Sequence, residues 1–186
     1  MAWAPLVTAV WVLFCDAVRG VRAQRAALAR TVHLQLQPDK RRPQGSESVG
    51  FIDGAVAEHG AHAGIGIFFE RGCALNLSAT ITGRPDPNRA ELAALFLALI
   101  RAPRDRRLTL YTDSQVTLRR IRDAVSDDRG RLVKGSDRRL LWWVLLLLRL
   151  REAKTIIRKI KGHSGHFVHD LADSLARAGG GGDERE

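Results

Sequence analysis

Hydrophobic and polar residues alternate along residues 107–112, a pattern typical of a short buried β-strand rich in strand-forming residues. The strand is expected to end at Asp113, and Ser114 is placed to cap a helix that runs through Ile121. A carboxylate between a strand and a helix lies where open α/β sheets place their active sites. Such an aspartate is also a common turn or capping residue, so the rest of the chain has to decide between the two interpretations.

Three stretches upstream predict further strands, at residues 49–57, 62–71 and 73–81. Their short connections are typical of an antiparallel meander. The first stretch carries Asp53-Gly54, a pair that alone is typical of a hairpin turn. Apolar residues on both sides of the pair favour a continuous strand here.

Three more helices and a last strand are predicted from the remaining pattern. Asn88 is expected to cap a helix that Pro103 ends, with Glu91 in its first turn, where a carboxylate usually caps or offsets the helix dipole. Residues 140–150 are intensely apolar and too short to span a bilayer, which predicts a buried helix.

Within that apolar helix, Trp142 and Trp143 cannot both face the core. A strand at residues 154–160 and a helix at residues 167–178 complete the order of elements. The order βββαβα–αβα predicts an α/β fold with a mixed sheet, three antiparallel strands followed by a βαβ unit.

The chain divides into three parts by composition. Residues 1–46 form a predicted N-terminal extension, apolar up to Cys15 and then rich in arginine; residues 47–179 form the compact domain, and residues 180–186 a disordered tail. An Arg-rich, amphipathic extension is typical of an organelle transit peptide such as a mitochondrial one, but also of a helical extension or part of a longer polyprotein. An intracellular location is expected, although the compartment stays open, and no stable membrane insertion is expected.

Charge and candidate chemistry add a function class. With 30 Lys and Arg against 20 Asp and Glu, the net charge of +10 favours a polyanionic partner, nucleic acid first. Four carboxylates nevertheless stand on or beside the predicted elements: Asp53, Glu91, Asp113 and Asp173. Brought together they would repel one another unless a divalent cation bound them, and hard oxygen ligands favour Mg²⁺ or Mn²⁺ over zinc.

Five short segments, in this order along the chain, resemble type I ribonuclease H. They are Phe-Ile-Asp-Gly at 51–54, Asn-Arg-Ala-Glu at 88–91, Tyr-Thr-Asp-Ser-Gln at 111–115, Lys-Gly-His-Ser-Gly at 161–165 and Ala-Asp-Ser-Leu-Ala at 172–176. The resemblance implies an RNase H-like fold, a five-stranded mixed sheet flanked by helices. It also implies two-metal, Mg²⁺-dependent endonucleolytic hydrolysis of the RNA strand of an RNA–DNA hybrid, with Mn²⁺ as a substitute ion, leaving 5′-phosphate and 3′-hydroxyl ends.

The same resemblance assigns roles to individual residues. The metal-binding carboxylates would be Asp53, Glu91, Asp113 and Asp173. His163, on a glycine-flanked loop, would assist leaving-group protonation or product release. Asn88 and Gln115 would contact the hybrid in its minor groove, and Gly54 would let the backbone approach the RNA strand. A monomer is expected, with a reverse transcriptase as partner if the domain came from a retroelement.

Two positions depart from the family's pattern. Asp86 stands where the family commonly has a threonine on a DNA phosphate, which an acid would repel, and His169 stands in place of an asparagine near the metals. These departures keep open a catalytically weak or inactive hybrid-binding domain, and another nuclease or integrase of the same fold is a further alternative. The spacing of His163, His166 and His169 invites zinc, but no further soft ligand lies nearby in the sequence.

Overall fold

The computed structural model describes residues 47–57, 62–81, 83–126, 137–162 and 167–181, and the backbone of residues 32–35. The strands are β1 (Val32–Gln35), β2 (Glu47–Val56), β3 (Ala63–Phe68), β4 (Leu77–Ile81), β5 (Arg107–Thr112) and β6 (Thr155–Lys159). The helices are α3 (Pro87–Arg101), α4 (Gln115–Ser126), α5 (Arg138–Leu150) and α6 (Phe167–Gly179).

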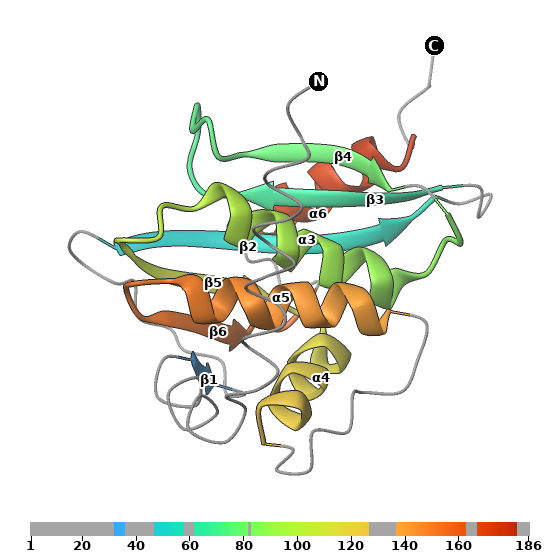
Figure 1. Ribbon diagram of the computed structural model, residues 1–186. Helices are drawn as coiled ribbons and strands as arrows, with labels where there is room; N and C mark the ends of the chain where they lie inside the picture. The colour runs from blue at the N-terminus through green and yellow to red at the C-terminus, as the bar shows by residue number, and fades with distance from the viewer. Residues whose placement is uncertain are drawn as a thin grey trace, which may run out of the picture.

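The five predicted strands form one mixed sheet, which confirms the predicted fold class. Strands β2, β3 and β4 are antiparallel, whereas β5 and β6 join β2 in parallel, so that the strand order is β1-β6-β5-β2-β3-β4 (Figure 1). Strand β1 was not predicted. It pairs in parallel with the outer side of β6, so part of the predicted N-terminal extension joins the sheet.

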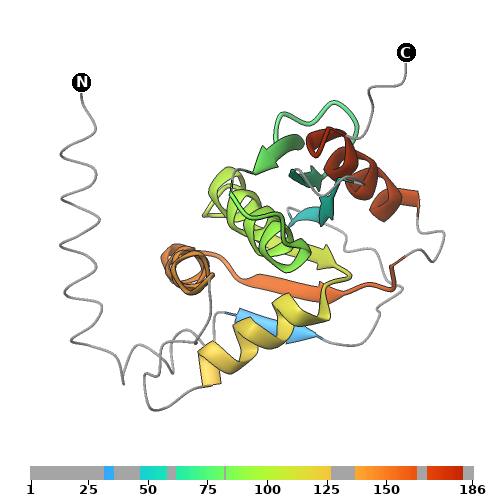
Figure 2. The same cartoon turned by 90° about the vertical axis from the view of Figure 1, so that its right-hand side faces the viewer.

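Helices cover both faces of the sheet. Helix α3 packs on β2 and β3 with α5 beside it, and α6 packs against β2, β3 and β4 from the other face (Figure 2). The core between the sheet and α3 is apolar, with the fully buried side chains of Ile52, Ile65, Leu92, Leu95 and Leu110. Burying each such side chain stabilises the fold by about 1.5–3 kcal/mol.

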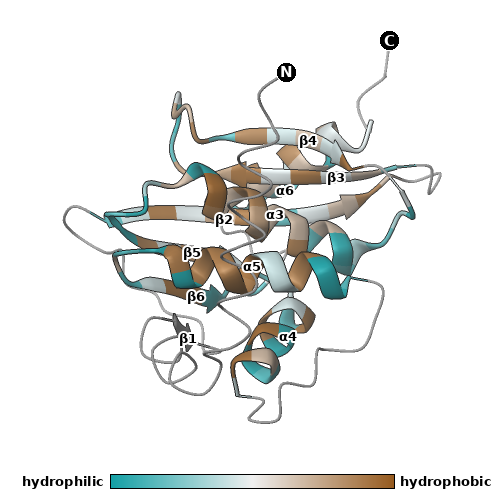
Figure 3. Ribbon diagram, viewed as in Figure 1, coloured by the Kyte–Doolittle hydropathy of each residue, from teal (hydrophilic) through white to brown (hydrophobic). Residues whose placement is uncertain are grey.

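Helix α5 confirms the buried helix predicted from the apolar run. Leu141, Val144 and Leu148 face the core at helical spacing, and apolar residues follow one another along the helix in Figure 3. Trp142 is half-buried and Trp143 is 38% exposed, so the two rings do not share the core, as expected. Within the part of the chain that the structure describes, no helix combines the length and the apolar character needed to cross a membrane.

Glycines in β3 allow α6 to approach the sheet closely. A Cβ atom on Gly64 would lie 1.9 Å from the carbonyl oxygen of Ala176, and one on Gly66 would lie 1.8 Å from that of Ala172. No side chain fits into such a gap, so the helix backbone rests directly on the strand. This contact sets the distance between the second half of α6 and β3.

The start of α3 corrects one prediction. Asp86, and not Asn88, caps the helix: its carboxylate accepts hydrogen bonds from the amides of Asn88 at 2.8 Å and Arg89 at 3.4 Å, and Pro87 opens the helix. The sequence pattern favoured Asn88 because the apolar spacing begins after it, although Asp-Pro is an equally good start signal. Asp86 therefore has a structural role that its charge alone did not reveal.

Candidate metal centre

Two of the predicted carboxylates meet because their strands are parallel neighbours. Phe51 of β2 is paired with Tyr111 of β5, so Asp53 and Asp113 stand at the same level, each two residues further along. Residues two apart on a strand point to the same face. The side chain of Asp53 is buried, 6% exposed, and Asp113 is half-buried at the strand end.

Glu91 lies against these strands and does not cap its helix. Helix α3 begins at Pro87, which places Glu91 beyond the first turn, and its side chain is only 6% exposed. The hydroxyl of Thr112 donates a hydrogen bond to Glu91 Oε2 at 3.1 Å. A Cβ atom on Gly54 would lie 2.4 Å from the Glu91 nitrogen, so the glycine permits this close approach of α3 to β2.

Neighbouring acids raise the pKa values of Asp53 and Glu91. Burial, and then the charges of Asp113 and Asp173, raise the pKa of Asp53 from 3.8 to about 6. Burial followed by the charges of Asp53 and Asp113 raises the pKa of Glu91 well above its usual value. Hydrogen bonds from Thr112 and from the backbone of Gly54 oppose the rise in the pKa of Glu91 without cancelling it. A bound divalent cation would remove this repulsion.

Asp113 is positioned by the chain that follows β6. The Lys159 ammonium donates a hydrogen bond to the backbone carbonyl of Asp113. A Cβ atom on Gly162 would lie 2.2 Å from Asp113 Oδ2, so a side chain at this position would displace the carboxylate. The sequence placed Gly162 in a loop motif, but its contact with Asp113 depends on tertiary packing.

Asp173 is held by a neighbour on its own helix. Arg177 Nε and Nη2 donate hydrogen bonds to Asp173 Oδ1 and Oδ2, at 3.0 and 2.7 Å. The charge of Asp173 still contributes to the raised pKa of Asp53. In this structure its carboxylate is therefore near the cluster and engaged in an ion pair.

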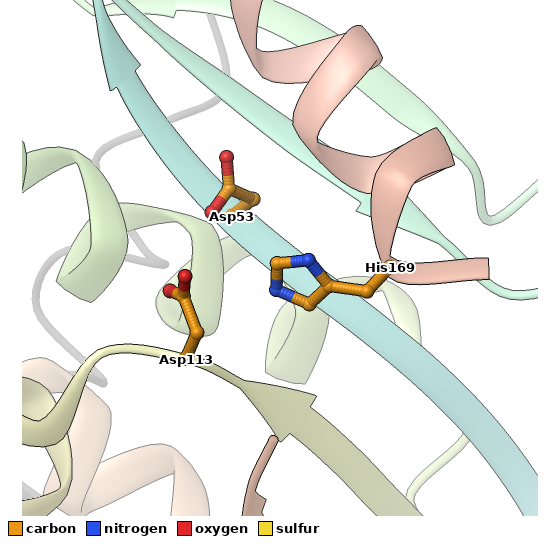
Figure 4. A group of neighbouring side chains, drawn as sticks. All are labelled: Asp53, Asp113 and His169. Carbon is orange, nitrogen blue, oxygen red and sulfur yellow. The ribbon is translucent and has the colours of Figure 1, made fainter. Parts of the chain in front are cut away.

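His169 completes the group of ligand atoms that lie closest together. One nitrogen of His169 and one oxygen each of Asp53 and Asp113 lie within 4.8 Å of one another. Figure 4 shows the imidazole, which comes from α6, beside the two carboxylates. Among the described residues this close group includes neither Glu91 nor Asp173.

The remaining predicted site residues lie at the starts of helices or outside the described residues. His163 lies outside the described residues. Asn88 is half-exposed in the first turn of α3, and Gln115 is exposed at the start of α4. Ser114 caps α4 as predicted, since its hydroxyl accepts a hydrogen bond from the Thr117 amide at 3.2 Å. The role of Thr112 at Glu91 was missed, because an alternating strand pattern does not distinguish a threonine that packs from one that holds a carboxylate.

The region that contains the metal centre is also the region that is similar to known proteins. A family model described as RNase H matches residues 46–180. Ribonuclease H1 of Mus musculus is 32% identical over 144 residues, which cover 73% of this chain and 50% of that protein. Ribonuclease H of Cereibacter sphaeroides is 29% identical over 143 residues, covering 72% of this chain and 95% of that protein. The chain spans about half the length of the mouse relative.

Proposed function

Because the chain belongs to the RNase H family, we propose that it cleaves the RNA strand of RNA–DNA hybrids endonucleolytically, leaving 5′-phosphate and 3′-hydroxyl ends. The proposal rests on one observation. Asp53 and Asp113 lie side by side inside the matched segment, and their charges act on the buried carboxylate of Glu91. A buried cluster of acids in a chain of net charge +10 is costly unless it serves a cation.

The donor set fits divalent cations, Mg²⁺ first with Mn²⁺ as a substitute. When bound, a pair of such cations supplies an activated water and stabilises the leaving oxygen of the phosphodiester. Asp53 and Asp113 would hold them, together with Glu91, which Thr112 orients. Asp173 is also proposed as a metal ligand. To bind a cation, its carboxylate would have to leave its ion pair with Arg177.

The remaining residues would bind the hybrid and exclude other substrates. The 2′-hydroxyl marks the RNA strand, and the short polar side chains of Asn88 and Gln115 are accessible to it at the starts of α3 and α4. His163 is proposed to assist leaving-group protonation or product release. The carboxylate of Asp86 accepts the first amides of α3, which accounts for an acid at this position without a phosphate contact.

The test is a cleavage assay of the purified chain with Mg²⁺ on an RNA–DNA hybrid, beside RNA duplex, DNA duplex and single strands. We expect cleavage of the hybrid RNA alone. Asp113→Asn should abolish cleavage and keep hybrid binding, whereas Asp123→Asn, an exposed acid on α4, should cleave normally. Hybrid binding without cleavage by the unchanged protein would refute the proposal and favour a binding domain.

Three finer proposals accompany this function. His163→Ala should slow turnover more than it weakens hybrid binding, and unchanged kinetics would remove its role. Within residues 1–46, the part ahead of β1 is proposed as a mitochondrial targeting segment, which fusion to a fluorescent reporter would test. Association with a reverse transcriptase is a hypothesis that follows only from a retroelement origin, and co-purification with such a polymerase would test it.

A further inference from the structure

Helix α6 offers the metal centre two side chains of different chemistry, one turn apart. His169 and Asp173 stand four residues apart and therefore share a face of the helix. The carboxylate of Asp173 is engaged by Arg177 through both oxygens. The imidazole of His169 is the side chain of α6 that reaches Asp53 and Asp113 (Figure 4).

We propose that His169 is a direct nitrogen ligand of a divalent cation held by Asp53 and Asp113, and that this ligand shifts the preference of the site from Mg²⁺ toward Mn²⁺. The inference deepens the proposed function, because it rests on the proposed metal site, but it does not depend on hybrid cleavage.

The geometry favours ligation over simple core packing. The side chain of His169 is 3% exposed, and one of its ring nitrogens is within 4.8 Å of an oxygen of each aspartate. Three donor atoms within 4.8 Å of one another could hold one metal ion, with small side-chain movements that draw them to coordination distance. The elements that carry them are fixed: Asp53 by the β2–β3 pairing, and His169 by the direct contact of α6 with Gly64 and Gly66.

The chemistry of the donor atoms predicts the change of metal. Mg²⁺ is a hard cation that prefers oxygen ligands and retains its waters, whereas Mn²⁺ accepts imidazole more readily and stands at the weak-binding start of the transition-metal series. An asparagine in place of His169 would present no comparable nitrogen lone pair, because its amide nitrogen is only a donor. Substituting imidazole for that amide therefore adds affinity for Mn²⁺ and little for Mg²⁺.

The experiment uses the full chain, stripped of metal and loaded with Mn²⁺ without nucleic acid. Pulsed electron paramagnetic resonance should detect ¹⁴N coupling from a directly bound imidazole, and absence of that coupling in the unchanged protein would overturn the inference without any variant. In His169→Asn the coupling should vanish. Titration calorimetry should then show Mn²⁺ affinity lower by about tenfold and Mg²⁺ affinity changed by less than about threefold.

His62→Asn is the matched control, since His62 is an exposed histidine outside the cluster. It should keep both the coupling and the Mn²⁺ affinity. A coupling that persists in His169→Asn would assign the nitrogen to another histidine and overturn the inference. Nitrogen coupling in a protein that does not cleave hybrids would support this inference and refute the proposed activity, whereas cleavage without nitrogen coupling would do the reverse.

Discussion

Replacing Asp53 with asparagine should stabilise the metal-free protein, although it removes a proposed metal ligand. Burial and the charges of Asp113 and Asp173 raise the pKa of Asp53 from 3.8 to about 6. A shift of about two pH units, at about 1.4 kcal/mol per unit, corresponds to about 3 kcal/mol. This is the cost of ionising Asp53 in the folded protein relative to the unfolded chain.

The sign of the pH dependence follows from proton binding. Because the pKa is higher in the folded state, the folded protein holds the proton more tightly between about pH 4 and pH 6 than the unfolded chain does. The free energy of unfolding of the unchanged protein therefore falls as the pH rises through this window, and it stays low above pH 6. Asp53→Asn carries no such proton, so its advantage should grow from near zero at pH 4 to about 3 kcal/mol at pH 7.

Urea unfolding followed by tryptophan fluorescence, in EDTA at pH 4, 5, 6 and 7, measures this difference. Asp123→Asn is the control, because Asp123 is 64% exposed beside Arg122, and it should change stability by less than about 0.5 kcal/mol. Added Mg²⁺ should reduce the advantage of Asp53→Asn, since only the unchanged site keeps its full affinity for the cation. Parallel stability curves of the two proteins from pH 4 to pH 7 would refute the reasoning.

Four further predictions concern the packing and hydrogen bonds that position the site. Gly66→Ala should lower the free energy of unfolding by more than about 2 kcal/mol in urea titrations, because the new Cβ atom would meet a carbonyl of α6 at 1.8 Å. Asp86→Ala should cost about 1 kcal/mol in the same measurement, and Asp86→Asn much less, since asparagine also caps a helix. Thr112→Val should weaken Mg²⁺ binding in calorimetry by about tenfold by releasing Glu91, and normal binding would contradict that role. A chain that begins at residue 47 should still cleave hybrids but aggregate more in size-exclusion chromatography, because it leaves the edge of β6 without β1.

Helices and strands were predicted well where the periodicity of neighbouring residues determines them. The alternation before Asp113 and the apolar run at 140–150 were each sufficient, because strand and helix periods are set by the residues themselves. Strand β1 could not be predicted in this way. Its pairing with β6 joins residues more than 120 positions apart, and no turn or local pattern links them.

The sequence predicted which acidic residues belong to the site, but it did not predict how they are arranged in space. Four carboxylates could be singled out from the sequence, and the structure brings Asp53 and Asp113 together with Glu91 beside them. The ion pair of Asp173 and the approach of His169 depend on how α6 rotates over the sheet, which the helical period alone does not fix.

The scaffold and the ligand set of this site are separable. The register between β2 and β5 brings Asp53 and Asp113 to one level through backbone hydrogen bonds, whatever the other side chains are. Helix α6 carries the proposed third ligand. His169 and Asp173 share one face of the helix one turn apart, so their positions along the helix axis decide which of them lies nearer the pair. A substitution on α6 can therefore change the preferred metal while the sheet stays the same. The direct packing of α6 on Gly64 and Gly66 fixes these positions, because the helix backbone has no intervening side chains over which to slide.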